Sequence, residues 1–195
     1  MKHNIKYNSQ RDNYSFKGKF KAWWQCFSTS SWMFMSFYSG LIDGKDDNGL
    51  SIYLDDVETK VGKPGIGEII KRKYKWITGG TSFWWLVQKA GIGKYLNADG
   101  IEGKAIFIDR IINYEKLRTL IKRGPVILQT KKIGRLPSGH IILAIGYDKS
   151  GIICHDPFGN AMTFYSDKDG KAVKYPDDYL RLFTGEKIRC IYWSD

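Results

Sequence analysis

The residues of this chain with the clearest chemical potential are a cysteine at the start of one expected helix and a histidine at the start of one expected strand. Cys26 opens the stretch CFSTSSWMFMSFYSGL, and His140 opens the apolar run HIILAIGY. The unpaired N–H groups and the positive end of the helix dipole favour a thiolate at a helix N-terminus. A nearby imidazole stabilises that thiolate further and can move protons. The pair is therefore typical of thiol hydrolases.

A carboxylate is expected beside this histidine. The strand at 140–147 is followed by a short turn and by a second strand at 151–156, so the two should form an antiparallel hairpin. The returning strand brings Asp156 back next to His140. A carboxylate in that place accepts the second imidazole N–H and fixes the tautomer and the orientation of the ring. We therefore predict a triad of Cys26, His140 and Asp156.

An acyl transfer also needs hydrogen-bond donors for the oxyanion that forms on the attacked carbonyl group. Two glutamines precede the cysteine, Gln10 and Gln25. Gln25 is the direct neighbour of Cys26, so its side chain should diverge from the thiol. We therefore expect the side-chain amide of Gln10 and the backbone N–H of Cys26 to form the oxyanion hole, with the chain between them looping out.

Apolar spacing and turn residues indicate the elements that position these groups. One helix is expected over residues 26–41, with Met33, Phe34, Phe37 and Leu41 on one face, and two more are expected at 81–91 and 113–124, each ending at a glycine. Strands are expected at 125–130, 140–147, 151–156, 161–166 and 187–193. This order indicates the α+β class, with N-terminal helices packed on a C-terminal antiparallel β-sheet. No repeat or linker divides the chain, so we expect a single domain over residues 1–195.

Four short motifs together resemble a known family. They are SQRDN at 9–13, CFSTSSWM at 26–33, the Gly-His pair that ends at His140, and HDPFGN at 155–160. In this order they resemble the papain-like cysteine peptidases of the bacteriocin-processing, ABC-transporter-peptidase type. The closer similarity is to the branch found in bacteriophage endolysins and tail-associated lysins. The resemblance spans residues 9–166 through these four short motifs, and no motif of the family can be quoted from residues 43–106.

The resemblance implies a fold, a set of roles and a substrate. It implies a papain-like fold with Cys26 as the nucleophile, His140 as the general base, Asp156 as the orienting group and Gln10 in the oxyanion hole. It also implies that the protein is an endolysin-type cysteine peptidase, which hydrolyses amide bonds in the peptide part of bacterial peptidoglycan.

The chain is strongly basic, with 31 Lys and Arg residues against 20 Asp and Glu residues and a net charge of +11. Such a charge attracts the anionic polymers of a bacterial envelope, which we expect as partners beside the peptidoglycan peptide. We expect no nucleic-acid partner, and we expect a monomer. The polar N-terminus has no apolar run like that of a signal peptide, so we expect the protein to stay in the host cytoplasm and to act at the cell wall after release.

The remaining histidines and cysteines are expected to be structural. His155 should face the opposite side of its strand from Asp156, at the surface or behind the site, and His3 should lie in a mobile end. Cys154 and Cys190 should fill the core. Three cysteines without CxxC spacing form neither a disulfide framework nor a zinc site, so we expect no metal ion and no cofactor.

Two other functions fit the same residues. A cysteine peptidase of the same fold could cleave a protein or a leader peptide, and a catalytically idle module could bind polyanions, with Cys26 an inert thiol and His140 a structural residue. A suspension of peptidoglycan separates these alternatives. Binding without clearing would favour the module, and neither binding nor clearing would favour the other peptidase.

Overall fold

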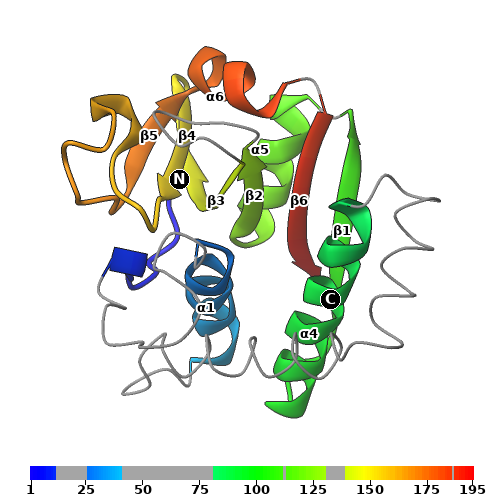
Figure 1. Ribbon diagram of the computed structural model, residues 1–195. Helices are drawn as coiled ribbons and strands as arrows, with labels where there is room; N and C mark the ends of the chain where they lie inside the picture. The colour runs from blue at the N-terminus through cyan, green and yellow to red at the C-terminus, as the bar shows by residue number, and fades with distance from the viewer. Residues whose placement is uncertain (12–25, 41–80, 112, 131–138, 186) are drawn as a thin grey trace, which may run out of the picture.

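The computed structural model describes residues 1–11, 26–40, 81–111, 113–130, 139–185 and 187–195, and Figure 1 shows the arrangement of their elements. In chain order these are α1 (Cys26–Ser39), α4 (Thr81–Ala98), β1 (Lys104–Ile111), α5 (Tyr114–Arg123), β2 (Val126–Thr130), β3 (His140–Tyr147), β4 (Gly151–His155), the 3-10 turn η3 (Ala161–Thr163), β5 (Val173–Pro176), α6 (Asp177–Thr184) and β6 (Lys187–Ser194). The predicted α+β class is confirmed.

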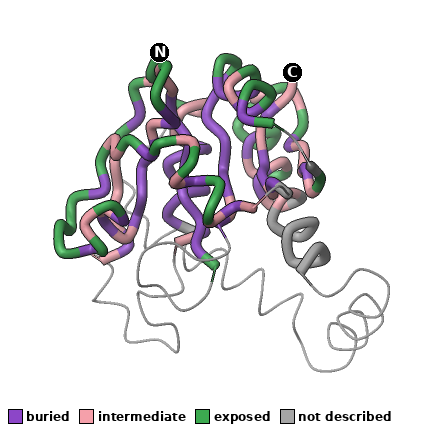
Figure 2. Tube along the Cα trace, turned by 90° about the horizontal axis from the view of Figure 1, so that it is seen from above, coloured by how far each residue is buried: buried purple, intermediate pink, exposed green. Residues whose placement is uncertain are grey.

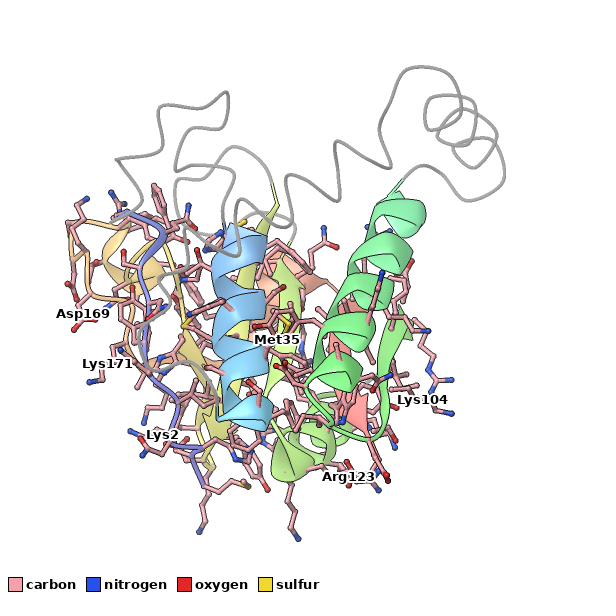
Figure 3. All side chains as sticks on the ribbon, turned by 90° about the horizontal axis from the view of Figure 1, so that it is seen from below. Lys2, Met35, Lys104, Arg123, Asp169 and Lys171 are labelled. Carbon is pink, nitrogen blue, oxygen red and sulfur yellow. The ribbon has the colours of Figure 1, made fainter. Side chains whose placement is uncertain are left out.

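The strands form one antiparallel sheet of six, in the order β1-β6-β2-β3-β4-β5. Helices α1 and α4 pack on one face of this sheet, and α5 and α6 pack on the other. Figure 3 shows α1 and α4 side by side, with Met35 between them. The two helical layers leave the central strands without solvent on either face, which is why the buried segments in Figure 2 run through the middle of the molecule.

The two faces of strand β3 are buried in two different hydrophobic clusters. Its odd-numbered residues, from Ile141 to Ile145, face the cluster under α1 and α4, whereas Ile142 and Ala144 face the cluster under α5 and α6. Side chains alternate between the two faces of a strand, so a run in which almost every residue is apolar fits a strand covered on both sides. The apolar run after His140 is therefore a central strand between two helical layers.

Helix α5 is the element that the sequence specified most completely. Asn113 caps its first turn by accepting a hydrogen bond from the backbone N–H of Lys116, and Gly124 follows its last residue. Leu117, Leu120 and Ile121 are buried, as their spacing predicted. The prediction over 113–124 is confirmed to within one residue at each end.

Helix α1 begins at Cys26, as predicted, but it is buried more evenly than one apolar face would require. Thr29, Ser30 and Ser31 are as inaccessible as the four residues from Trp32 to Met35. The predicted end at Leu41 lies outside the described residues. The small hydroxyl residues allow α1 to lie close to its neighbours, because their short side chains occupy little space on the helix surface.

One predicted helix end and one predicted strand are wrong. Helix α4 continues through Gly91 and Gly93 to Ala98, because a helix tolerates interior glycines at a modest cost. The expected strand at 161–166 is instead the turn η3, capped by the Asn160 side chain. Phe164 and Tyr165 follow with positive φ angles of 53° and 63°, which no strand accommodates. Strands β1 and β5 and helix α6 were not predicted.

The N-terminal segment is docked on the sheet, so the expectation of a mobile end around His3 is wrong. The backbone N–H of His3 donates to the Ile145 carbonyl group at 2.8 Å, and its imidazole Nε2 donates to the Ile121 carbonyl group at 2.6 Å. Lys2 forms a bridge with Gly146. These contacts direct the segment along β3 towards the loop that follows β4.

Among the described helices, none is long and apolar enough to cross a membrane.

Candidate active site

His140 is the first residue of β3, and its imidazole is almost completely buried at the end of the sheet. Its Nε2 atom donates to Asp156 Oδ1 at 2.7 Å. The rings of Phe158 and Tyr165 meet the imidazole edge-on, with centroid distances of 6.3 and 6.2 Å. Because Nε2 is engaged by the carboxylate and the ring plane is held by two aromatic neighbours, the opposite nitrogen, Nδ1, is available to another partner.

A β-bulge places Asp156 on the same face of the sheet as His140. Next to the turn, Tyr147 pairs with Ile152, and an unbroken register would continue until Asp156 stood opposite Leu143, on the other face. The register instead shifts between Ala144 and Gly146, so that Leu143 pairs with His155. Asp156 then follows on the same face as His140, two residues along the strand, within reach of a diagonal contact.

The Asp156 carboxylate is fully buried and accepts hydrogen bonds from several donors. Oδ1 accepts from His140 and, at 3.0 Å, from the backbone N–H of Phe158. Oδ2 accepts from the hydroxyl groups of Tyr175, at 2.8 Å, and Tyr165, at 3.4 Å. All four groups donate, which is the environment that a buried carboxylate anion requires.

The backbone of Asp156 is held as firmly as its side chain. Its N–H donates to the Gly170 carbonyl group at 2.9 Å, and its carbonyl group accepts from the Tyr7 hydroxyl at 3.0 Å. Gly170 lies so close that a Cβ atom there would clash with the Asp156 carbonyl oxygen. A glycine at 170 is therefore needed for the loop to close over the aspartate.

Cys26 is the first residue of α1 and is half-buried. One turn later, the Ser30 hydroxyl donates to the carbonyl group of Ile141 at 3.3 Å, which ties the start of α1 to the start of β3. The Cys26 side chain thereby lies close enough to the His140 imidazole to help raise its pKa. The thiol, the imidazole and the carboxylate thus form a continuous chain of contacts.

This arrangement changes the acidity of the histidine. Burial alone would lower the pKa of His140, but the charge and hydrogen bond of Asp156, together with the Cys26 side chain, outweigh it and raise the pKa from 6.5 to about 10. An imidazole with a raised pKa carries its proton at neutral pH. The site therefore holds an imidazolium that is hydrogen-bonded to a buried carboxylate and lies near the sulfur of Cys26.

Gln10 lies beside the loop that carries Asp156. Its backbone N–H donates to the Pro157 carbonyl group at 2.9 Å, and its side chain is buried. The next residue, Arg11, stacks its guanidinium on the Phe158 ring at 3.7 Å. The SQR part of one motif and the DPF part of another therefore contact each other directly. Gln25, the alternative that we set aside, lies outside the described residues.

The other candidates are structural, with one correction. His155 is buried instead of lying at the surface: Nε2 donates to the Ile5 carbonyl group, and Nδ1 accepts from the backbone N–H of Ala172. Burial first, and then the charges of Lys171 and Lys2, lower the pKa of His155, so the ring stays neutral. Within the described ranges, no group of three His, Cys, Asp or Glu side chains could hold a metal ion.

The three thiols should differ widely in reactivity. Cys154 and Cys190 are completely buried, and burial raises the pKa of Cys154 well above its ordinary value and that of Cys190 to about 12. Because only the thiolate reacts, iodoacetamide at neutral pH should modify Cys26 at least about a hundredfold faster than the other two. Peptide mapping by mass spectrometry gives the three rates. The variant His140→Ala is the matched control, because it keeps Cys26 accessible and should slow its labelling; equal native rates at all three thiols would contradict the expectation.

Sequence reasoning missed the tyrosines that hold Asp156. Tyr165 and Tyr175 lie nine and nineteen residues after the aspartate, with no spacing that links them to it. The only available signal was the cluster of aromatic residues after the HDPFGN motif. Such a cluster does not show which hydroxyl groups turn inward.

Comparisons with known proteins show which family the chain matches. The profile of the Peptidase_C39 like family matches residues 2–182, a range that includes Cys26, His140, Asp156 and Gln10. None of the curated proteins matches the chain. Among solved structures, the crystal structure of a protein from Bacillus anthracis described as a C39-like peptidase has 19% sequence identity and a TM-score of 0.36. The alignment covers 56% of this chain and 57% of that one, so this chain spans little more than half of that relative.

Proposed function

Because the chain belongs to the Peptidase_C39 like family, we propose that it is a cysteine peptidase that cleaves amide bonds through a covalent thioester. In this proposal Cys26 is the nucleophile, His140 is the general acid and base, and Asp156 orients His140. Gln10 and the backbone N–H of Cys26 stabilise the oxyanion. The observation that carries the proposal is the buried 2.7 Å hydrogen bond from His140 Nε2 to Asp156, on an imidazole whose pKa the nearby Cys26 side chain also helps to raise.

The first half of the reaction forms the thioester. In the reactive form the proton of the Cys26 thiol resides on His140, and the Cys26 thiolate attacks the carbonyl carbon of the substrate. The carbonyl oxygen becomes an oxyanion, which accepts hydrogen bonds from the backbone N–H of Cys26 and from the side-chain amide of Gln10. The imidazolium of His140 then gives its Nδ1 proton to the nitrogen of the leaving amine. The C–N bond breaks, the amine departs, and the acyl group remains on Cys26.

The second half releases the acid. The now neutral His140 takes a proton from a water molecule, whose oxygen attacks the thioester carbonyl carbon. The C–S bond breaks, the carboxylic acid product leaves, and the Cys26 thiolate again faces a protonated imidazole. Asp156 keeps its charge throughout and stabilises each imidazolium that forms.

We propose the peptide part of bacterial peptidoglycan as the substrate. Two features support this choice: the SQRDN and HDPFGN motifs resemble those of phage lysins, and the net charge of +11 favours contact with the anionic polymers of an envelope. The basic side chains Lys2, Lys104, Arg123 and Lys171 lie around the rim of the molecule in Figure 3. Charges at the rim can attract a polymer without occupying the site.

Digestion of purified peptidoglycan tests the substrate and the reaction class together. We expect muropeptide mass spectrometry to show fragments in which one amide bond of the stem or cross-link has gained one water molecule. Release should weaken as salt rises from 0.1 to 1 M, because the Debye length falls from about 10 to about 3 Å. The variant Cys26→Ala, which keeps the charge and loses the thiol, is the control.

Three results would contradict this proposal in different ways. Fragments with new sugar ends would indicate a glycosidase reaction. Binding to peptidoglycan without release would favour the polyanion-binding module. Neither binding nor release, together with cleavage of an unrelated peptide, would favour a peptidase that acts on proteins or leader peptides.

A further inference from the structure

The Asp156 carboxylate divides its two oxygens between two sets of partners. Oδ1 faces the imidazole of His140, whereas Oδ2 accepts only tyrosine hydroxyl groups, those of Tyr175 at 2.8 Å and Tyr165 at 3.4 Å, among the hydrogen bonds that the described residues make to it. A rotation about the bond to the carboxylate would break both sets at once. The tyrosines therefore hold the rotation of the carboxylate about its Cβ–Cγ bond, and with it the direction in which an oxygen is presented to His140.

The direction of the Tyr175 hydrogen bond is set by a further contact. The backbone N–H of Ala161 donates to the Tyr175 hydroxyl oxygen at 3.2 Å, so the hydroxyl proton must point elsewhere, towards Oδ2. Burial first, and then the charge of Asp156, raise the pKa of both tyrosines above the ordinary value, so both keep their protons. Each hydroxyl group therefore keeps a proton with which it donates a hydrogen bond to the carboxylate.

The backbone around Tyr165 is held in an unfavourable conformation. Phe164 and Tyr165 both have positive φ angles, of 53° and 63°, a region that residues with side chains rarely occupy. The result is that Phe164 is 62% exposed, whereas Tyr165 turns inward against the His140 ring. Strain of this kind persists where the surrounding contacts require it, and it is concentrated at functional sites.

The position of Tyr175 follows from the sheet. Tyr175 pairs with Ile152 in β4, and Val173 pairs with Cys154, so Tyr175 shares the face on which Cys154 and Asp156 lie. It is completely buried. A phenylalanine would fill the same space and would lack only the hydroxyl group.

We propose that Tyr175 and Tyr165 are positioning residues, which orient the Asp156 carboxylate for its hydrogen bond to His140. The inference rests on the catalytic roles proposed above for His140 and Asp156. Neither hydroxyl group touches the reacting atoms, and the effect of the two hydroxyl groups passes through the aspartate. The edge-on contact of the Tyr165 ring with His140 is separate, and a phenylalanine at 165 would keep it.

Tyrosine-to-phenylalanine variants test the inference by kinetics. We expect Tyr175→Phe to lower kcat about tenfold with little change in KM, and Tyr165→Phe, whose hydrogen bond is longer, to lower kcat about threefold, because a hydrogen bond to a charged group makes a difference of that order. In an Asp156→Asn background, Tyr175→Phe should lower kcat much less, because the carboxylate through which Tyr175 acts on His140 is already absent. Tyr179→Phe is the matched control: Tyr179 stacks on Tyr175, but its hydroxyl group donates to the Ala161 carbonyl group.

A spectroscopic measurement tests the same inference without a substrate. The proton on His140 Nε2 should give a downfield signal in ¹⁵N-edited NMR, because it is held between a nitrogen and a buried carboxylate. Tyr175→Phe should shift this signal or broaden it, and Tyr179→Phe should leave it unchanged. Melting temperatures show whether each variant is folded, and Tyr165→Phe serves as a second reporter if Tyr175→Phe is unstable.

The outcomes separate this inference from the proposed function. If the wild-type protein shows no hydrolysis that depends on Cys26, the proposed function fails, and the NMR signal still decides the role of the tyrosines. If Tyr175→Phe behaves like Tyr179→Phe in rate and signal, or if it costs as much in the Asp156→Asn background as in the wild type, the inference is overturned. A purely structural Tyr175 would lower the melting temperature and leave the His140 signal in place.

Discussion

Replacing Cys26 with serine should abolish turnover, with kcat/KM reduced by at least about a thousandfold. A serine hydroxyl group has a much higher pKa than a thiol, so the His140 imidazole alone cannot generate a useful concentration of the alkoxide. Muropeptide release from peptidoglycan measures the loss. The fold should be kept, because Cys26 is half-buried and the two side chains differ by one atom.

The control for this variant is the melting temperature, which should change by only a few degrees. A second control is Cys154→Ser, which alters a thiol in the core and should affect stability before it affects the rate. Residual activity of Cys26→Ser above a tenth of the wild-type value would rule out Cys26 as the nucleophile.

Changes at the histidine and its aspartate should give the second largest effects, in a definite order. His140→Ala should remove activity about as completely as the loss of the thiol, because the proton then has no carrier. Asp156→Asn should lower kcat/KM by about tenfold to a thousandfold, because an amide still forms hydrogen bonds but does not stabilise the imidazolium. It should also cost about 1–3 kcal/mol of folding free energy, since the amide N–H₂ group would face donors on every side.

The pH dependence of the same variants follows from the raised pKa of His140. The protonated imidazole supplies a proton to the leaving amine, so kcat/KM should fall on the alkaline side near pH 10 and not near 6.5. In Asp156→Asn, this alkaline limb should move to lower pH, because the largest contribution that raises the His140 pKa is removed. Steady-state rates between pH 6 and 11 test the shift.

Stability should change with pH for the same reason. A histidine whose pKa is higher in the folded chain than in the unfolded chain stabilises the fold fully below pH 6.5, and the contribution is lost as the pH rises to about 10. The free energy of unfolding of the wild type should therefore decline over this range, and Asp156→Asn should flatten the decline. An Asp156→Asn enzyme with the full rate and an unchanged alkaline limb would show that Asp156 has no role in catalysis.

Local signals in the sequence determined much of this protein. The start of α1 at Cys26, the capped helix α5 between Asn113 and Gly124, and the hairpin that returns Asp156 towards His140 follow from apolar spacing, caps and turns within a few residues of each other. Such signals act over one helical turn or one strand, so they can be read without knowing the rest of the fold.

Other features depended on the tertiary structure, because the partners are far apart in the chain or on different strands. The one-residue bulge between Ala144 and Gly146 decides which face Asp156 occupies, since one residue of register reverses every later side chain. The docking of Gln10 on Pro157 joins segments that lie 147 positions apart, and the inward turn of Tyr165 needs a positive φ angle that local preference opposes. Packing of the whole chain stabilises these arrangements, and no short stretch of sequence contains the partners that do so.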